Sequence, residues 1–235
     1  MPVETESVQE LIASARFVVF DFDGPICRLF AQYTAQRVAG ELVEWLALHG
    51  LRELLTDEER RHPDPWLLLR AVDQRHPDSD LVAELEEWLT RHELKAVPTA
   101  WPTAYADPLI RTWSAVGVRL AIATNNSALV VRRYLDSRDL LACFAPNIYG
   151  RTQDLGLLKP HPHSLNRALN ALGAAPSAAL MIGDTPADLI ASREAGVPFL
   201  GYATNVEKAD LLRSTGATAV VSSLWPLLRV LRGQM

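Results

Sequence analysis

Short apolar runs recur along the chain, separated from one another by sequence that is compatible with helices. The first run, FVVF at residues 17–20, is rich in β-branched and aromatic side chains, as is typical of a strand buried on both faces of a parallel sheet. Similar runs lie at residues 119–123, 179–182, 198–202 and 219–221. This alternation predicts an α/β fold with a doubly wound parallel sheet.

The segment at residues 28–97 has a different pattern. Apolar positions at helical spacing predict helices over residues 33–49 and 80–94, with no convincing strand between them. The proline-rich stretch at residues 97–108 then favours an extended connector over a helix, on account of Pro98, Pro102 and Pro108. The chain would therefore cross twice between an α/β core and a helical insert, and the two crossings would form a hinge.

Composition and charge exclude several classes of protein. The 235 residues are 49% hydrophobic and 22% charged, as in ordinary globular proteins, and 23 basic against 28 acidic residues give a net charge of −5. This balance predicts neither a nucleic-acid partner nor a membrane surface. The two cysteines, Cys27 and Cys143, are too few for a disulfide framework, and neither an export signal nor a membrane-spanning run is visible. We expect a cytoplasmic monomer or homodimer.

Two carboxylates follow the first apolar run directly. Asp21 and Asp23 stand at the predicted carboxyl end of a strand, where ligands of open α/β sheets bind. Two carboxylates this close stay ionised only beside a cation or strong donors, which favours Mg²⁺. The alternative is that the Asp23-Gly24 pair only turns the chain.

A second acidic pair follows the run at residues 179–182. If a helix begins near Thr185 or Pro186, Asp188 lies one turn into it and close to Asp184 at the strand end. Capping of that helix is the alternative, and it accounts for one aspartate more readily than for two.

Polar residues after the run at residues 119–123 suit a phosphate. Thr124 and Asn125 offer a hydroxyl and an amide at a strand-to-helix turn, while Ser127 is explained equally well as a helix N-cap. Lys159, between Leu158 and Pro160, is either a solvated surface residue or the cation that four carboxylates around a phosphate require.

These motifs occur in a characteristic order. DxDG, Thr-Asn, Lys-Pro and GDxxxD resemble the four motifs of the haloacid dehalogenase superfamily of phosphohydrolases. The insert resembles the C1-type cap of the subgroup with phosphoglycolate phosphatase-like and β-phosphoglucomutase-like members. The resemblance implies a Rossmann-like core formed by residues 1–27 and 100–235, and a helical cap formed by residues 28–99.

The resemblance also implies catalytic roles. Asp21 would be the nucleophile that forms an aspartyl-phosphate, and Asp23 the general acid and base. Thr124 and Lys159 would hold the transferring phosphoryl group, with Asn125 as a further phosphate ligand.

A metal site is implied as well. The Asp21 carboxylate, the Asp23 backbone carbonyl and Asp184 would bind Mg²⁺. Asp188 would support the site, either at the metal through water or by orienting Lys159.

The activity implied is Mg²⁺-dependent hydrolysis of a phosphomonoester of a small metabolite. Asp23 disfavours dehalogenation, because dehalogenases of this superfamily lack an aspartate there. Pro25, Cys27 and Arg28 depart from the usual continuation of the first motif, so the resemblance names no substrate. A phosphomutase of the β-phosphoglucomutase type and a non-catalytic phosphate sensor are the alternatives.

Overall fold

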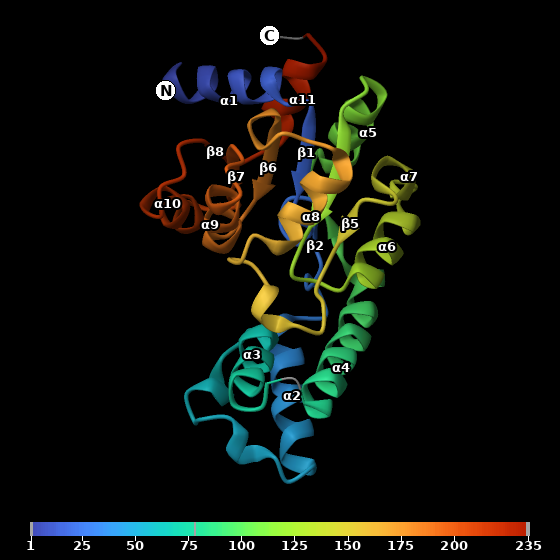
Figure 1. Cartoon of the computed structure of the whole chain (residues 1–235), viewed down its shortest axis with the longest axis vertical. Coiled ribbons are helices and arrows are strands. Elements are labelled where there is room, and N and C mark those ends of the chain that lie inside the picture. Colours follow the sequence, from blue (N-terminus) through green and yellow to red (C-terminus); the bar gives the residue numbers. More distant parts are fainter. Residues whose placement is uncertain (1, 78, 234–235) are drawn as a thin grey trace. The chain divides into compact units, whose positions relative to one another are not determined.

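The computed structural model describes residues 2–77 and 79–233. Its main sheet has six parallel strands in the order β5-β4-β1-β6-β7-β8 (Figure 1). The strands are, in chain order, β1 (Phe17–Phe20), β4 (Arg119–Ala123), β5 (Ile148–Tyr149), β6 (Ala179–Gly183), β7 (Phe199–Tyr202) and β8 (Val220–Val221). The chain builds outward from β1 on one side and then returns to build on the other, so the predicted α/β, doubly wound fold is confirmed.

Helices connect these strands and flank the sheet. They are α5 (Ala106–Ala115), α6 (Ala128–Ser137), α7 (Leu141–Phe144), α8 (His163–Leu172), α9 (Pro186–Glu194) and α10 (Val206–Ser214), with short 3₁₀ turns at Leu155–Leu157 and Pro176–Ala178. Helix α1 (Pro2–Ser14) precedes β1, and α11 (Trp225–Leu231) follows β8. No helix of the described residues is long and apolar enough to cross a membrane.

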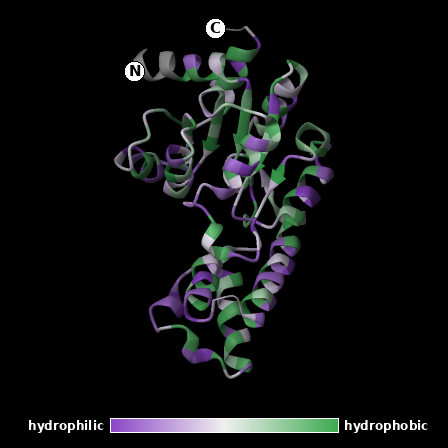
Figure 2. Cartoon of the chain, viewed as in Figure 1, coloured by the Kyte–Doolittle hydropathy of each residue, from purple (hydrophilic) through white to green (hydrophobic). Residues whose placement is uncertain are grey.

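Both faces of the sheet are buried, and β1 shows how. Val19 packs on one face in a core that includes Leu165 of α8 and Leu189 of α9. The next residue, Phe20, points to the other face, where its ring lies 5.8 Å from Trp113 of α5 and 6.1 Å from Phe144 of α7. The strands are accordingly rich in apolar residues (Figure 2), as expected of a parallel sheet buried on both faces.

The chain divides into two compact units. The first comprises Met1–Arg28, Pro102–Arg151 and Gly156–Met235, and the second comprises Leu29–Trp101 and Thr152–Leu155. The second is helical, with α2 (Ala35–Leu48), α3 (Pro65–Arg75), α4 (Asp80–Ala96) and 3₁₀ turns at Arg52–Leu54, Glu59–Arg61 and Val97–Thr99. Its apolar faces bury residues such as Leu42, Leu68 and Leu85.

Three details of the sequence prediction were wrong. The two-stranded sheet of β2 (Cys27–Arg28) and β3 (Trp101–Pro102) was missed, as was β5, because two-residue strands carry no periodic signal. The proline-rich connector is not extended throughout. Pro98 lies in a 3₁₀ turn and Pro108 in the first turn of α5, where a proline costs no helix hydrogen bond.

Candidate active site

The sheet register brings the predicted site residues to one edge. Phe20, the last residue of β1, is level with Ile122 of β4 and Ile182 of β6. Asp21 continues from β1, and its N–H donates to the Ile182 carbonyl at 2.8 Å. Thr124 and Asp184 follow the two neighbouring strands. The register of the sheet therefore brings the backbones of Asp21, Thr124 and Asp184 close together.

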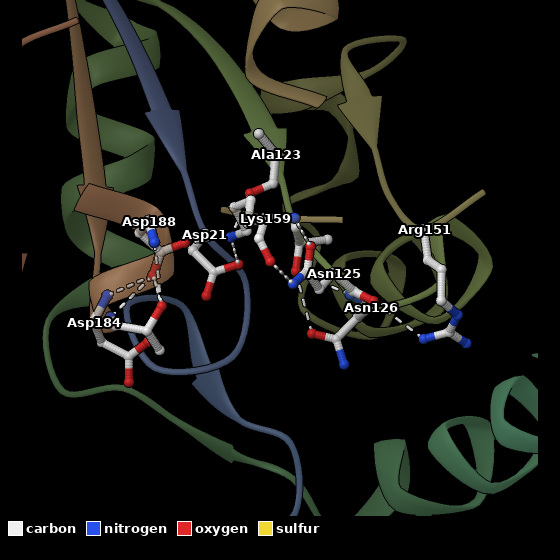
Figure 3. A network of polar contacts seen from close by, with 10 residues as sticks. Asp21, Ala123, Asn125, Asn126, Arg151, Lys159, Asp184 and Asp188 are labelled. Atoms are coloured by element: carbon white, nitrogen blue, oxygen red, sulfur yellow. Dashed lines mark hydrogen bonds and ion pairs between the residues drawn. The ribbon is translucent and has the colours of Figure 1, made fainter. Parts of the chain in front are cut away.

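A buried ion cluster lies at this edge (Figure 3). The Lys159 ammonium donates to Asp21 Oδ1 at 2.7 Å, to the Ala123 carbonyl at 3.0 Å and to Asp188 Oδ1. The side chains of Lys159 and Asp188 are 3% and 0% exposed, so this lysine is not a solvated surface residue. The ordinary surface interpretation of Lys159 is excluded.

The charges in this cluster shift one another's pKa values. Burial raises the pKa of Asp21, and nearby Asp188 raises it further, whereas Lys159 acts in the opposite direction. Burial alone would lower the pKa of Lys159, but the two carboxylates raise it above its usual range. Lys159 therefore stays protonated at neutral pH.

Asp188 both caps a helix and holds Lys159. Its Oδ2 accepts from the N–H groups of Asp184 and Thr185, at 3.1 and 3.0 Å, and from the Thr185 hydroxyl at 2.7 Å. Together with the N–H of Asp188, which donates to the Thr185 hydroxyl, this forms a capping box at the start of α9. Both carboxylate oxygens of Asp188 thus have partners in the protein, and one of these partners is the Lys159 ammonium.

Asp184 is the least satisfied of the acidic residues. Lys208 of α10 donates to its Oδ2 at 2.6 Å, while its buried Oδ1 has no hydrogen-bond partner among the described residues. Burial raises the pKa of Asp184 to about 7 despite the charge of Lys208. Lys208 was missed from the sequence, although it follows the end of strand β7 and so belongs to the same edge.

The acidic residues fit a cation. Carboxylate oxygens of Asp21, Asp184 and Asp188 all lie within 4.8 Å of one another. Gly24, at φ +124°, makes room for them, because a Cβ there would lie 2.4 Å from the Asp184 carboxyl carbon. A buried carboxylate oxygen without a partner, in an all-oxygen donor set, suits a hard divalent cation.

Asp23 lies in the tight loop that follows β1. The Gly24 N–H donates to the Cys27 carbonyl at 2.6 Å, which closes the loop, and the Asp23 side chain is partly exposed. Cys27 is fully buried, and burial with the charges of Asp23 and Asp21 raises its pKa well above the usual range. This thiol is therefore a packing residue.

The polar turn after β4 is organised by its own contacts. Asn126 donates its N–H to the Thr124 hydroxyl, which in turn donates to Asn126 Oδ1, both at 3.2 Å. Asn125 contacts the backbone of Lys159 at both ends of its amide. Ser127 stands at the N-cap of α6, but its side chain makes no capping hydrogen bond. Arg151, which the sequence analysis did not single out, donates to the Asn125 carbonyl at 3.1 Å.

The residues that form this site lie within the part of the chain that matches a known family. The sequence model of the haloacid dehalogenase-like hydrolase family matches residues 15–196, which include both acidic pairs, the Thr-Asn turn and Lys159. The chain belongs to the haloacid dehalogenase-like hydrolase family, as its motifs indicated.

Individual relatives have names of phosphatases. The chain is 27% identical to a phosphoglycolate phosphatase of Aquifex aeolicus over 187 residues, 77% of this chain and 81% of that protein. It is 27% identical over 117 residues to a putative pyrophosphatase PpaX of Caldanaerobacter subterraneus, 50% of this chain. A phosphoglycolate phosphatase of Rhodospirillum rubrum is 32% identical over 52% of this chain. The chain spans only about half the length of the last two relatives, 52% and 48%.

Solved structures share the fold. A predicted phosphatase from Clostridium acetobutylicum superposes with a TM-score of 0.69 at 18% identity, covering 92% of this chain and 98% of that one. A hydrolase of the family from Deinococcus radiodurans, with bound phosphate and sodium, has a TM-score of 0.61 at 22% identity, covering 94% and 97%.

Proposed function

We propose that the protein is a Mg²⁺-dependent phosphatase that hydrolyses a phosphomonoester of a small metabolite through an aspartyl-phosphate on Asp21. The observation that carries this proposal is the buried pair of Asp21 and Lys159, 2.7 Å apart, beside the unpartnered oxygen of Asp184. It supports the proposal because a buried carboxylate, a fixed positive charge and an oxygen without a hydrogen-bond partner among the described residues lie together at the carboxyl ends of the strands. Family membership and the phosphatase relatives support the same reaction class.

In the first half-reaction, a carboxylate oxygen of Asp21 attacks phosphorus and the ester P–O bond breaks. The leaving alkoxide takes a proton from the Asp23 carboxyl group, so the product alcohol departs neutral. Thr124 and Lys159 hold the non-bridging oxygens of the phosphoryl group, where negative charge must be balanced. Asp188 keeps the Lys159 ammonium in place through their ion pair.

In the second half-reaction, the Asp23 carboxylate removes a proton from water. The water oxygen attacks phosphorus, the bond from phosphorus to Asp21 breaks, and inorganic phosphate leaves. Asp21 is thereby regenerated as a carboxylate next to Lys159.

The cation site would use the Asp21 carboxylate, Asp184 and the backbone carbonyl of Asp23. When bound there, Mg²⁺ supplies positive charge that offsets the charge of the phosphoryl oxygens. Lys208 would give up its contact with Asp184 or share that carboxylate. The helical residues 28–99 would serve as the cap domain.

The test is phosphate release from an aryl phosphate and from a panel of phosphorylated metabolites, with and without Mg²⁺. Phosphoglycolate and inorganic pyrophosphate belong in the panel because relatives are named for them. We expect Mg²⁺-dependent release that Asp21→Asn lowers by at least about 10⁴-fold, since the nucleophile is lost. Asp136→Asn, an exposed carboxylate at the end of α6, is the matched control and should behave as wild type.

Other outcomes would move the assignment. Full activity in Asp21→Asn would exclude the aspartyl-phosphate mechanism, provided that circular dichroism shows both proteins folded. Accumulation of an isomer of a sugar phosphate, instead of free phosphate, would identify a phosphomutase. Binding of phosphate without turnover of any compound would identify a sensor.

A further inference from the structure

The carboxamide of Asn125 makes hydrogen bonds to both the N–H and the carbonyl of Lys159. Asn125 Oδ1 accepts the Lys159 N–H at 2.7 Å, and Asn125 Nδ2 donates to the Lys159 carbonyl at 3.1 Å (Figure 3). We propose that Asn125 is a positioning residue: it sets the place of the Lys159 ammonium by fixing the backbone that carries it. This inference rests on the proposed function of Lys159 as a phosphoryl-binding cation.

Asn125 is itself held firmly. The buried Arg151 side chain donates to the Asn125 carbonyl at 3.1 Å, and the Arg151 N–H donates to the Asn126 carbonyl at 2.9 Å. Gly150 allows this close approach, because a Cβ there would lie 2.5 Å from the Asn126 carbonyl oxygen and from the Ala128 nitrogen. The turn after β4 is therefore a fixed support, and Lys159, 34 positions later, is attached to it.

The side-chain amide of Asn125 has both an acceptor for the Lys159 N–H and a donor for the Lys159 carbonyl, which neither a carboxylate nor an ammonium group would offer. The Lys159 backbone lies in a turn, so Asn125 supplies the hydrogen bonds that a helix or sheet would otherwise supply. With its backbone fixed, the Lys159 ammonium reaches three acceptors at once: Asp21, Asp188 and the Ala123 carbonyl. Asn125 thus acts on phosphate through Lys159, whereas the motif alone implied a direct phosphate ligand.

The first experiment measures the position of Lys159 without any substrate. The chain has three lysines, Lys95, Lys159 and Lys208, so acetylation of each by acetic anhydride can be followed by mass spectrometry of the full-length protein after digestion. In wild type, Lys159 should be protected relative to the exposed Lys95. Asn125→Ala should raise the relative labelling rate of Lys159 about tenfold, as expected when a hydrogen bond that keeps a segment closed is lost.

The second experiment is a double-mutant cycle on hydrolysis of an aryl phosphate. Asn125→Ala should lower kcat/KM by about tenfold or more in wild type, but by less than about twofold in a Lys159→Met background. Where hydrolysis by Lys159→Met is too slow to measure, binding of inorganic phosphate by calorimetry replaces it in the same cycle. Additive effects would mean that Asn125 contacts phosphate directly, which would overturn the proposal.

Two further variants separate positioning from a loss of folding. Asn125→Asp keeps the acceptor for the Lys159 N–H but loses the donor, so its labelling rate should fall between those of wild type and Asn125→Ala. Asn166→Ala, an exposed amide on α8, should match wild type in both experiments. Unchanged labelling of Lys159 in a folded Asn125→Ala protein would refute the positioning role. Absence of hydrolysis in wild type would instead refute the proposed function, while the labelling result still decides whether the amide fixes Lys159.

Discussion

Two clusters of polar side chains invite comparison, one at the carboxyl ends of the strands and one in the helical unit. In the helical unit, the Tyr33 hydroxyl lies 2.7 Å from both Glu41 Oε2 and His92 Nδ1, and His92 lies 3.1 Å from the same Glu41 oxygen. His92 also stacks on Trp88, with ring centroids 3.7 Å apart. At the sheet edge, Lys159 and three buried aspartates form the cluster instead.

The two clusters differ in how far they satisfy themselves. In the helical unit, hydroxyl, carboxylate and imidazole meet one another, and none of their buried atoms lacks a partner in the described part of the chain. At the carboxyl ends of the strands, the buried Asp184 Oδ1 has no hydrogen-bond partner among the described residues. Burial raises the pKa of Asp184, and the nearby carboxylates of Asp21 and Asp188 raise it further. A cluster whose buried polar atoms all have partners stabilises a fold. A cluster with a buried charged atom that lacks a partner is typical of a ligand-binding site.

Removal of the central cation should have the largest effect. Lys159→Met leaves Asp21 and Asp188 buried side by side, so we expect a loss of about 3–5 kcal/mol in the free energy of unfolding. Urea unfolding measures this loss. Lys95→Met, on an exposed lysine of the helical unit, should change stability by less than about 0.5 kcal/mol. Equal effects of the two variants would show that the buried ion pairs of Lys159 add no stability beyond that of an exposed lysine.

Neutralising Asp184 should act in the opposite direction. Asp184→Asn removes a buried charge with an unpartnered oxygen, so the metal-free protein should gain about 1 kcal/mol at pH 8 and lose its rise in Tm with Mg²⁺. Asp188→Asn should destabilise the protein, because the Asp188 carboxylate accepts the hydrogen bonds of the capping box at the start of α9. Differential scanning fluorimetry with and without Mg²⁺ compares them. A retained Mg²⁺ response in Asp184→Asn would argue against the cation site.

Filling the space at Gly24 tests the shape of the site. Gly24→Ala should destabilise the protein by about 1–3 kcal/mol and weaken Mg²⁺ binding, because the new Cβ meets the Asp184 carboxylate. Gly117→Ala is a matched control, since Gly117 also has a positive φ, +84°, but open space around it. Calorimetric Mg²⁺ affinity should change only for Gly24→Ala, and equal affinities would contradict the fit described above.

The smallest effect on stability is expected from protonation of His92 in the helical unit at acidic pH. Burial and nearby cations lower the pKa of His92 below its usual 6.5, so the unfolded chain binds a proton more readily than the folded one. This contribution to stability is complete above pH 6.5 and is lost as the pH falls toward the lowered pKa. His92→Gln should flatten the fall in Tm between pH 7 and pH 5. An unchanged pH profile would show that other groups cause it.

Residues adjacent to strong strand signals were predictable from the sequence. The runs at residues 17–20 and 119–123 coincide with β1 and β4, so Asp21 and Thr124 could be placed at strand ends without a structure. Thr185 and Pro186 likewise predicted the start of α9.

Contacts made by the fold alone could not be predicted. Lys208 reaches Asp184 from a helix 24 positions later, and Arg151 reaches Asn125 across 26 positions, with no local pattern to mark either. The bond between Asn125 and the Lys159 backbone joins two turns, whose geometry depends on packing rather than on periodicity.

The pairing of Asp21 with Lys159 spans 138 positions of the chain, and it exists only when β1 has β4 and β6 on its two sides. Contacts this distant in sequence slow folding, because the entropy of closing a long loop is lost before the contact contributes any stability. If the labelling experiment finds the Lys159 amine protected, that protection reports complete renaturation. A refolding reaction sampled with an acylating reagent would distinguish fully assembled molecules from compact but incorrectly assembled ones without the use of any substrate.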